Sequence, residues 1–295
     1  FWNASVDYGY VSHRWTIAGE TATGNCGAIA TLNAASYLFS DYFSLLALHR
    51  FYSARYYSLF SNSFSEGSDV QDENGAYLGF TWVPAHRWSI TGYSDFAYFV
   101  WPKYHTKQST QCWDHLLNIL YQPNKRWTLG TRLRYKEKAG ITTGRWRLYA
   151  TFADENWSAK TSVDYTMSKE MGEKSSQKEA DDANPSQGYL LNENLSYRWH
   201  WLRLSGSFSY FHTQDFSSRI YVYEPGLLYQ MSFSSFYSEG IRCALVARSE
   251  IGKHLLVIAK LGSTNYFDRS HISTGLQEIA ASHQTDLEIQ MKWKW

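Results

Sequence analysis

The last eleven residues, TDLEIQMKWKW (Thr285–Trp295), alternate without a break between apolar and polar side chains. The apolar positions are Leu287, Ile289, Met291, Trp293 and Trp295, and the polar positions between them are Asp286, Glu288, Gln290, Lys292 and Lys294. A period of two puts the two sets on opposite faces of a β-strand. An apolar face, a charged face and a terminal aromatic residue are typical of the closing strand of a transmembrane β-barrel.

The same pattern recurs along the chain, over 126–136, 145–152, 157–166 and 202–210. Each run is close to the roughly ten residues that a tilted strand needs to cross a bilayer. Many of the runs begin or end on Trp or Tyr, as the aromatic girdles of such barrels do. Parity predicts a lipid-facing set of Trp127, Leu129, Leu133, Trp146, Leu148, Leu204, Phe208, Leu287, Ile289, Met291 and Trp293.

A soluble antiparallel sandwich or barrel would also alternate in this way. Composition favours the membrane reading, because aromatic residues make up 18% of the chain, with 13 Trp and 23 Tyr, and gather near strand ends. The longest aliphatic stretch, Leu255–Ala259, is far shorter than the roughly 20 residues of a membrane helix. The sequence therefore predicts an all-β protein, an antiparallel up-and-down transmembrane β-barrel of about 15–16 strands.

Connection lengths predict the orientation of this barrel. Long connections are expected near Ala54–Asn74, Pro102–Thr110, Met167–Gln187, Thr213–Gly240 and Ser263–Thr285, and short turns separate them. Outer-membrane barrels carry long loops outside and short turns in the periplasm, so the C-terminus is expected in the periplasm. Residues 1–295 are interpreted as one barrel, and as a processed or truncated segment that lacks upstream residues, because the chain begins inside a strand pattern.

Two of the long connections differ in character. Met167–Gln187 is rich in Lys, Glu, Asp and Ser, and is expected to be solvated and mobile. The segment from Arg219 to Gly240 is instead rich in aromatics: Tyr221, Tyr223, Tyr229, Phe233, Phe236 and Tyr237. It is interpreted either as a loop that folds over or into the barrel mouth, or as a strand that extends beyond the bilayer.

A basic cluster lies between Lys125 and Arg147. Parity puts Arg132, Arg134, Lys136, Arg145 and Arg147 on the polar face of two neighbouring strands, where they would form one basic wall of the lumen. Such a wall could bind an anion or polyanion. The alternative is a structural network, in which Asp164, Asp286, Glu288 or an inserted loop neutralises these cations.

Enzyme and cofactor motifs give no positive signal. The chain lacks a Gly-x-Ser-x-Gly elbow, a His-Glu-x-x-His motif, a Walker loop and a Cys-x-x-Cys pair, so no catalytic residue, metal or cofactor is predicted. A barrel hydrolase built from scattered residues such as His49, His115, His200 and His212 is kept as an alternative. The three cysteines are too few for a disulfide framework, although a bridge between Cys26 and Cys112 is considered.

Several phrases resemble a known family. They are Gly19-Glu20, Gly27–Ala34, Tyr57–Glu66, Trp101–Tyr104, Arg219–Glu224, Gly275–Ile279 and Gln290–Trp295. Together they resemble the C-terminal barrel of a Bacteroidota outer-membrane family, whose longer members carry an N-terminal periplasmic helix-hairpin-helix domain of the competence type. That resemblance implies DNA handling, although the helix-hairpin-helix module itself would lie upstream of Phe1.

Three functions follow as hypotheses. The first is a porin-like transport or uptake barrel for an anionic cargo, with DNA indicated only by the resemblance. The second is a non-conducting scaffold subunit of a multi-protein outer-membrane machine for transport, secretion or assembly, and the third is the hydrolase. Expected partners are outer-membrane lipid and lipopolysaccharide, other outer-membrane or periplasmic proteins, and, under the first hypothesis, nucleic acid.

Overall fold

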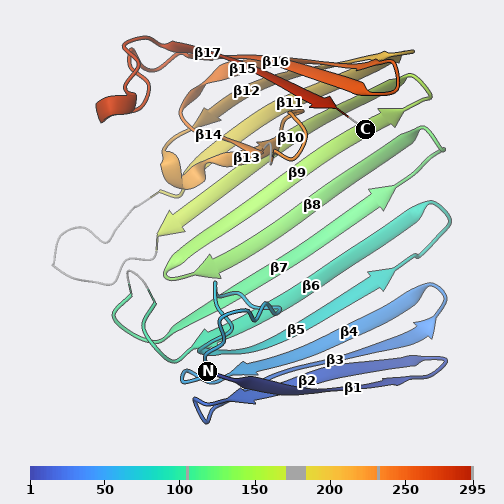
Figure 1. Cartoon of the computed structure of the whole chain (residues 1–295), viewed down its shortest axis with the longest axis vertical. Coiled ribbons are helices and arrows are strands. Elements are labelled where there is room, and N and C mark those ends of the chain that lie inside the picture. Colours follow the sequence, from blue (N-terminus) through green and yellow to red (C-terminus); the bar gives the residue numbers. More distant parts are fainter. Residues whose placement is uncertain (104–105, 171–183, 231–232, 294–295) are drawn as a thin grey trace. The chain divides into compact units, whose positions relative to one another are not determined.

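The computed structural model describes residues 1–295 except 104–105, 171–183, 231–232 and 294–295. Fifteen strands pair in one antiparallel sheet, and each pairs with its neighbours in chain order (Figure 1). They are β1 (Asn3–Val11), β2 (Trp15–Gly24), β3 (Ile29–Ser40), β4 (Phe43–Tyr52), β5 (Glu73–Trp82), β6 (Trp88–Phe99), β7 (Thr110–Tyr121), β8 (Trp127–Lys138), β9 (Ile141–Ala153), β10 (Trp157–Glu170), β11 (Ser186–Trp199), β12 (Leu202–Thr213), β15 (Glu239–Ile251), β16 (Leu255–Tyr266) and β17 (His283–Trp293).

The segment between β12 and β15 forms structure of its own. It contains a 3-10 turn, η1 (Phe216–Ser218), and a separate two-stranded sheet of β13 (Ile220–Tyr223) and β14 (Phe233–Phe236). A second 3-10 turn, η2 (Gly275–Gln277), lies between β16 and β17. Within the described ranges, no helix is long and apolar enough to cross a bilayer. The predicted all-β up-and-down class is confirmed, and fifteen strands of the main sheet match the predicted number.

In this sheet many polar side chains are buried and many apolar side chains are exposed, which is the reverse of the distribution in a soluble protein. On β10, the polar residues Ser162, Asp164 and Thr166 are buried, whereas Val163 and Tyr165 between them are exposed. All eleven residues of the predicted lipid-facing set are likewise exposed, from 39% for Leu204 to 71% for Met291. We call the face with the buried polar residues the inner face of the sheet, and the opposite face the outer face. An apolar outer face over a polar inner face is the arrangement of a membrane barrel.

Turn chemistry explains the short connections. Ala139 and Gly140 join β8 to β9 with positive φ angles of 50° and 76°, as a two-residue type I′ hairpin requires. His200, in the turn before β12, and Gly252, after β15, also have positive φ. Along the chain, long connections alternate with short turns, except that the β2–β3 and β8–β9 connections, which occupy long-connection positions in this order, are also short.

The chain divides into two compact units. Unit 1 comprises Phe1–Leu120, Arg132–Gly144 and Glu170–Asp181, and unit 2 comprises Tyr121–Thr131, Arg145–Lys169 and Asp182–Trp295. Each unit carries one long connection that folds back onto its inner face. These two connections position the candidate site. The solvated stretch predicted within Met167–Gln187 and the aromatic Trp295 lie largely or wholly outside the described residues.

Candidate functional site

The first inward loop, Ser53–Asp72, connects β4 to β5 and lies on the inner face of unit 1. The Tyr52 hydroxyl donates to the carbonyl oxygen of Phe64 at 2.8 Å. The Arg50 guanidinium lies over the Phe64 ring, 5.0 Å from its centroid, and the Phe64 ring meets Tyr77 edge-on. Because Arg50 and Tyr77 project from β4 and β5, these contacts hold the loop against the sheet.

A buried ion network anchors the start of β5 to this loop. The Arg50 side chain is fully buried and donates to Glu73 and, at 2.7 and 3.1 Å, to both carboxylate oxygens of Asp95. Glu73 also accepts the backbone N–H groups of Glu66 and Gly67, each at 2.9 Å. Arg50 and the backbone N–H groups give both carboxylates hydrogen-bond partners, which reduces the desolvation cost of burial.

A glycine makes room for that network. A Cβ atom on Gly75 would lie 2.6 Å from Cζ of Arg50 and 2.7 Å from the carbonyl oxygen of Phe96. Any larger residue at position 75 would therefore displace the guanidinium or the neighbouring strand. The small residue on β5 is what allows Arg50 to lie flat between Glu73 and Asp95.

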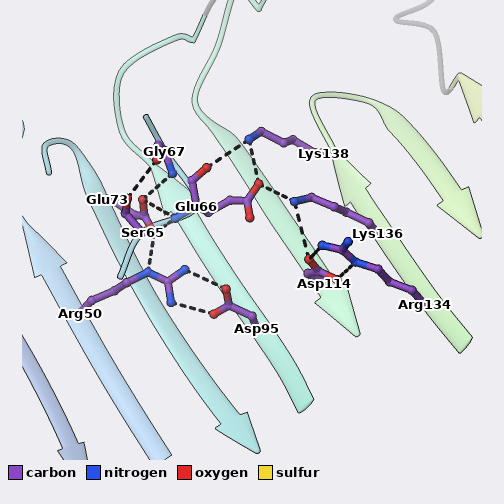
Figure 2. Close-up of polar contacts among 10 residues, drawn as sticks. All are labelled: Arg50, Ser65, Glu66, Gly67, Glu73, Asp95, Asp114, Arg134, Lys136 and Lys138. Atoms are coloured by element: carbon purple, nitrogen blue, oxygen red, sulfur yellow. Dashed lines mark hydrogen bonds and ion pairs between the residues drawn. The ribbon is translucent and has the colours of Figure 1, made fainter. Parts of the chain in front are cut away.

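Glu66, at the tip of the first inward loop, joins the loop to β8 (Figure 2). Its Oε1 atom lies 2.6 Å from Nζ of Lys136 and 2.8 Å from Nζ of Lys138. On the adjacent inner face, Arg134 donates to Asp114 at 2.9 Å, and Lys136 lies 3.6 Å from the same carboxylate. Burial acts to raise the pKa of Glu66, but hydrogen bonds from the two lysines outweigh it and the pKa is lowered.

An open hollow of about 750 Å³ lies on the inner face of unit 1. It extends from the β1–β2 turn at His13 to Tyr77 and Tyr93, whose rings stack at 5.2 Å. Its lining mixes hydroxyl side chains (Ser36, Ser44, Thr81 and Thr91) with apolar ones (Leu38, Leu45, Leu46, Phe80 and Leu116). Since Tyr77 also contacts Phe64, the hollow begins where the first inward loop ends.

The second inward loop, Gln214–Ser238, lies on the inner face of unit 2. Its sheet β13–β14 contributes Ile220, Val222 and Phe236 to a buried cluster with Leu190 of β11 and Phe211 of β12. Farther along, Leu227 and Leu228 pack on a second cluster formed by Val246, Leu256 and Ile258. The loop thus carries its own apolar contacts onto an otherwise polar wall.

Glu224 is the ionic anchor of the second inward loop. Its carboxylate accepts from Nη2 of Arg242 at 2.9 Å and from Nζ of Lys260 at 2.8 Å. Asp286 lies 3.1 Å from Arg242 on the other side. Burial acts to raise the pKa of Glu224, but the Arg242 and Lys260 hydrogen bonds dominate and lower it.

Two polar contacts fix the flanks of this loop. The Arg147 guanidinium of β9 donates to the carbonyl oxygen of Tyr221 at 3.1 Å. The Gln290 side chain of β17 accepts from the backbone N–H of Leu228 at 2.8 Å and donates to its carbonyl at 3.2 Å. The second loop is therefore tied to β9, β15, β16 and β17.

The predicted basic cluster is distributed over both units. Arg132, Arg134 and Lys136 belong to unit 1, and Arg145 and Arg147 belong to unit 2, so a common wall stays a prediction. Three of the five have acidic partners: Arg134 with Asp114, Lys136 with Glu66, and Arg147 with Asp164. Asp286 and Glu288 are engaged elsewhere, with Arg242 and Lys260. These contacts are those of the structural-network alternative, with an inserted loop supplying Glu66.

The six aromatic residues of the predicted mouth loop divide by environment. Phe236 is buried against Phe211. Tyr221, Tyr223 and Phe233 are exposed on β13 and β14, and Tyr237 packs edge-on against Phe216. Tyr229 is 85% exposed, yet it accepts a hydrogen bond from Lys292. The segment pairs with itself and not with the main sheet, so it folds inward in place of extending a strand.

Sequence reasoning missed the residues that matter most for these anchors. Glu66 and Glu224 each sit in a loop without periodicity, and their lysine and arginine partners are separated from them by 18 to 72 positions. Cys26, Cys112 and Cys243 are free, so the bridge considered between Cys26 and Cys112 is absent. Among the described residues, no group of three or more His, Cys, Asp and Glu could hold a metal ion.

Comparison with known proteins places the fold. No family model matches the chain, and no curated protein matches it. The structure is similar to OccK10 (OpdN) of Pseudomonas aeruginosa, with a TM-score of 0.53 and 10% identity over 98% of this chain and 87% of that chain. It is also similar to Pseudomonas aeruginosa OpdK, solved with vanillate, with a TM-score of 0.50 and 8% identity over 97% and 81% of the two chains. These likenesses show the fold. The chain has the fold of a porin-like outer-membrane β-barrel.

Proposed function

We propose that this chain is an integral outer-membrane transport barrel that passes small anionic solutes, and that its two inward loops narrow the passage. The observation that carries the proposal is the anchoring of each loop by one carboxylate, Glu66 or Glu224, to cations of the inner face. A loop pinned in this way sets the size and the charge of the space beside it.

The open hollow of unit 1 supports transport over a purely structural role. Hydroxyl side chains and two tyrosines share its lining with apolar side chains, and it lies beside the first inward loop. β8 carries four cations in unit 1 (Arg132, Arg134, Lys136 and Lys138), and among the described residues their ion pairs are with Glu66 and Asp114. The excess positive charge supports an anionic cargo, because like charge repels cations from the same passage.

The comparison suggests a probe for transport assays. OpdK, which is 8% identical to this chain, was solved with vanillate, and vanillate is an aromatic carboxylate. DNA remains the cargo implied by the family resemblance. A narrowed passage favours a small solute over a polymer.

Reversal potential across a planar bilayer tests the proposal. With a gradient of KCl across the membrane, the protein should conduct and its reversal potential should have the sign of anion selectivity. A cation-selective current would overturn the anionic cargo. Absence of current from correctly folded protein would favour the scaffold hypothesis, which the packing of the second inward loop also supports. Labelling by a serine-directed probe would revive the hydrolase hypothesis.

We further propose the orientation: long connections outside the cell, short turns and the C-terminus in the periplasm, and an outer face in contact with lipid and lipopolysaccharide. Its support is that all the long connections lie at the same ends of the strands, although the β2–β3 and β8–β9 connections at those ends are short, together with the apolar outer face.

A further inference from the structure

Three arginines lie side by side on the inner face of unit 2, close to the short turns. The strand register pairs Arg198 of β11 directly with Arg203 of β12, and Arg203 directly with Arg248 of β15. Directly opposed residues of an antiparallel pair have Cβ atoms about 4.5–5.5 Å apart, and like charges placed there are destabilising. We call Arg198, Arg203 and Arg248 the arginine row.

The register also shows which face the row occupies. Arg248 is opposite Ile258, and Ile258 is opposite Gln290. Ile258 is buried under Leu228 of the second inward loop, and Gln290 bonds to the backbone of that residue. The row therefore continues the inner face on which the tip of the second inward loop rests, while the alternating Leu204 and Trp199 are exposed on the outer face.

Little negative charge compensates the row. Glu250 lies 3.2 Å from Arg248, and both side chains are partly exposed. Within the described ranges, neither Arg198 nor Arg203 forms a salt bridge, and both residues are exposed. By contrast, the inner-face arginines Arg50, Arg134, Arg147 and Arg242 each have a carboxylate in hydrogen-bond contact. The row is thus a place on the described inner face of unit 2 where cations remain available to a ligand.

We propose that the arginine row is an oxyanion-binding site at the short-turn end of the passage, which takes a carboxylate or phosphate group of a small solute. Guanidinium groups present paired N–H donors that match the two oxygens of either group. Three adjacent guanidiniums offer more donors than one oxyanion can use, so a ligand with two anionic groups fits best.

This inference deepens the proposed function, and it rests on that function only for its role in transport. Binding is measured on detergent-solubilised full-length protein by isothermal titration calorimetry, with succinate as the dicarboxylate probe and inorganic phosphate as the second probe. The variants are Arg203→Gln, Arg203→Lys and Arg198→Gln. Lys253→Gln is the matched control, because Lys253 lies in the β15–β16 turn at the same end but outside the row.

Arg203→Gln should weaken binding of the preferred oxyanion by about tenfold or more, as expected for a charge-assisted hydrogen bond. Arg203→Lys should weaken it less, and Lys253→Gln should change it less than twofold, by the same reasoning. The Arg203→Gln protein should melt at the same or a higher temperature, because a repulsive neighbour is removed. If the Arg203→Gln protein melts at a lower temperature and binds the oxyanion as tightly as the wild type, the arginine row has a structural role and the proposed binding site is wrong.

Comparing the binding of succinate with that of phosphate, together with the conductance measured in a planar bilayer, distinguishes the remaining outcomes. Tighter binding of succinate assigns a carboxylate ligand, and tighter binding of phosphate assigns a phosphate ligand. Failure of both to bind overturns the inference, even if the protein conducts. Row-dependent binding without any conductance would leave the site standing and overturn the transport proposal. If only a short single-stranded DNA binds, with a steep salt dependence, the small-solute assignment is wrong and the polymer is the ligand.

Discussion

The carboxylate of Glu66 lies 2.6 Å from the Nζ atom of Lys136, a residue 70 positions farther along the chain. Lys138, two residues on, reaches the same oxygen at 2.8 Å. The Glu66 carboxylate therefore forms ion pairs with two cations of β8, and these contacts hold the first inward loop on the inner face of unit 1. Glu224 forms the same kind of double ion pair in unit 2, with Arg242 and Lys260.

Glu66→Gln should release the first inward loop. The two lysines would lose their carboxylate, and a charged hydrogen bond of this kind contributes about 1.5–3 kcal/mol. We expect trypsin to cut at Arg55 roughly ten times faster in the variant, measured on folded protein in detergent. Glu155→Gln is the control, since Glu155 lies exposed in the β9–β10 turn. Equal cleavage rates in all three proteins would show that Glu66 does not hold the loop.

Low pH should release both inward loops from the inner face. The release should occur only at pH values below the ordinary pKa of a glutamate side chain. The pKa of Glu66 and that of Glu224 are both lowered from 4.5. A lowered carboxylate pKa stabilises the docked loop fully above pH 4.5, and this stabilisation is lost as pH falls through the docked-state value. Protease sensitivity should therefore stay flat from pH 7.5 to 5 and rise below pH 4.5. A rise already complete at pH 6 would point to a histidine and contradict the assignment.

Leu129→Arg should impair assembly, whereas Thr128→Arg should be tolerated. Leu129 is 40% exposed on the outer face, and Thr128 is its neighbour on the inner face. An arginine facing lipid costs about 2–4 kcal/mol at the midplane and less near the interface. The heat-dependent gel mobility of the folded barrel and its urea midpoint in liposomes measure the effect. Equal behaviour of the two variants would contradict the assignment of faces.

An epitope inserted after Leu276 should be accessible on intact cells. Leu276 is fully exposed in η2, within a long connection that we place outside the cell. A tag inserted after Gly252, in the short β15–β16 turn, should bind antibody only once the outer membrane is permeabilised. The opposite pattern would invert the proposed orientation.

The strands were predictable because each is encoded locally. In β10 and β17, a period of two in hydrophobicity is enough to place Val163 or Ile289 outside and Asp164 or Glu288 inside. Turn positions also follow from the sequence, since a pair such as His200-Trp201 ends one alternating run and starts the next. No long-range information is needed for either feature.

The anchors were not predictable, because they depend on contacts between distant segments. Nothing adjacent to Glu66 or Glu224 in the sequence signals a lysine on another strand. The inner-face charges posed the same difficulty: parity puts Arg134 and Arg147 on the polar face of their strands, but it does not identify their partners Asp114 and Asp164. The arginine row was not predictable either, since its members come together only through the registers of β11, β12 and β15.

Single-channel recording of the wild-type protein beside the Glu66→Gln, Glu224→Gln double variant tests the central claim most directly. We predict a small anion-selective conductance for the wild type, and a larger, noisier conductance for the double variant, because both loops lose their ionic anchors. Glu155→Gln should match the wild type. If both proteins conduct equally, the two loops do not narrow the passage. If the wild type and the double variant are both silent in the bilayer while remaining folded, the transport proposal is wrong.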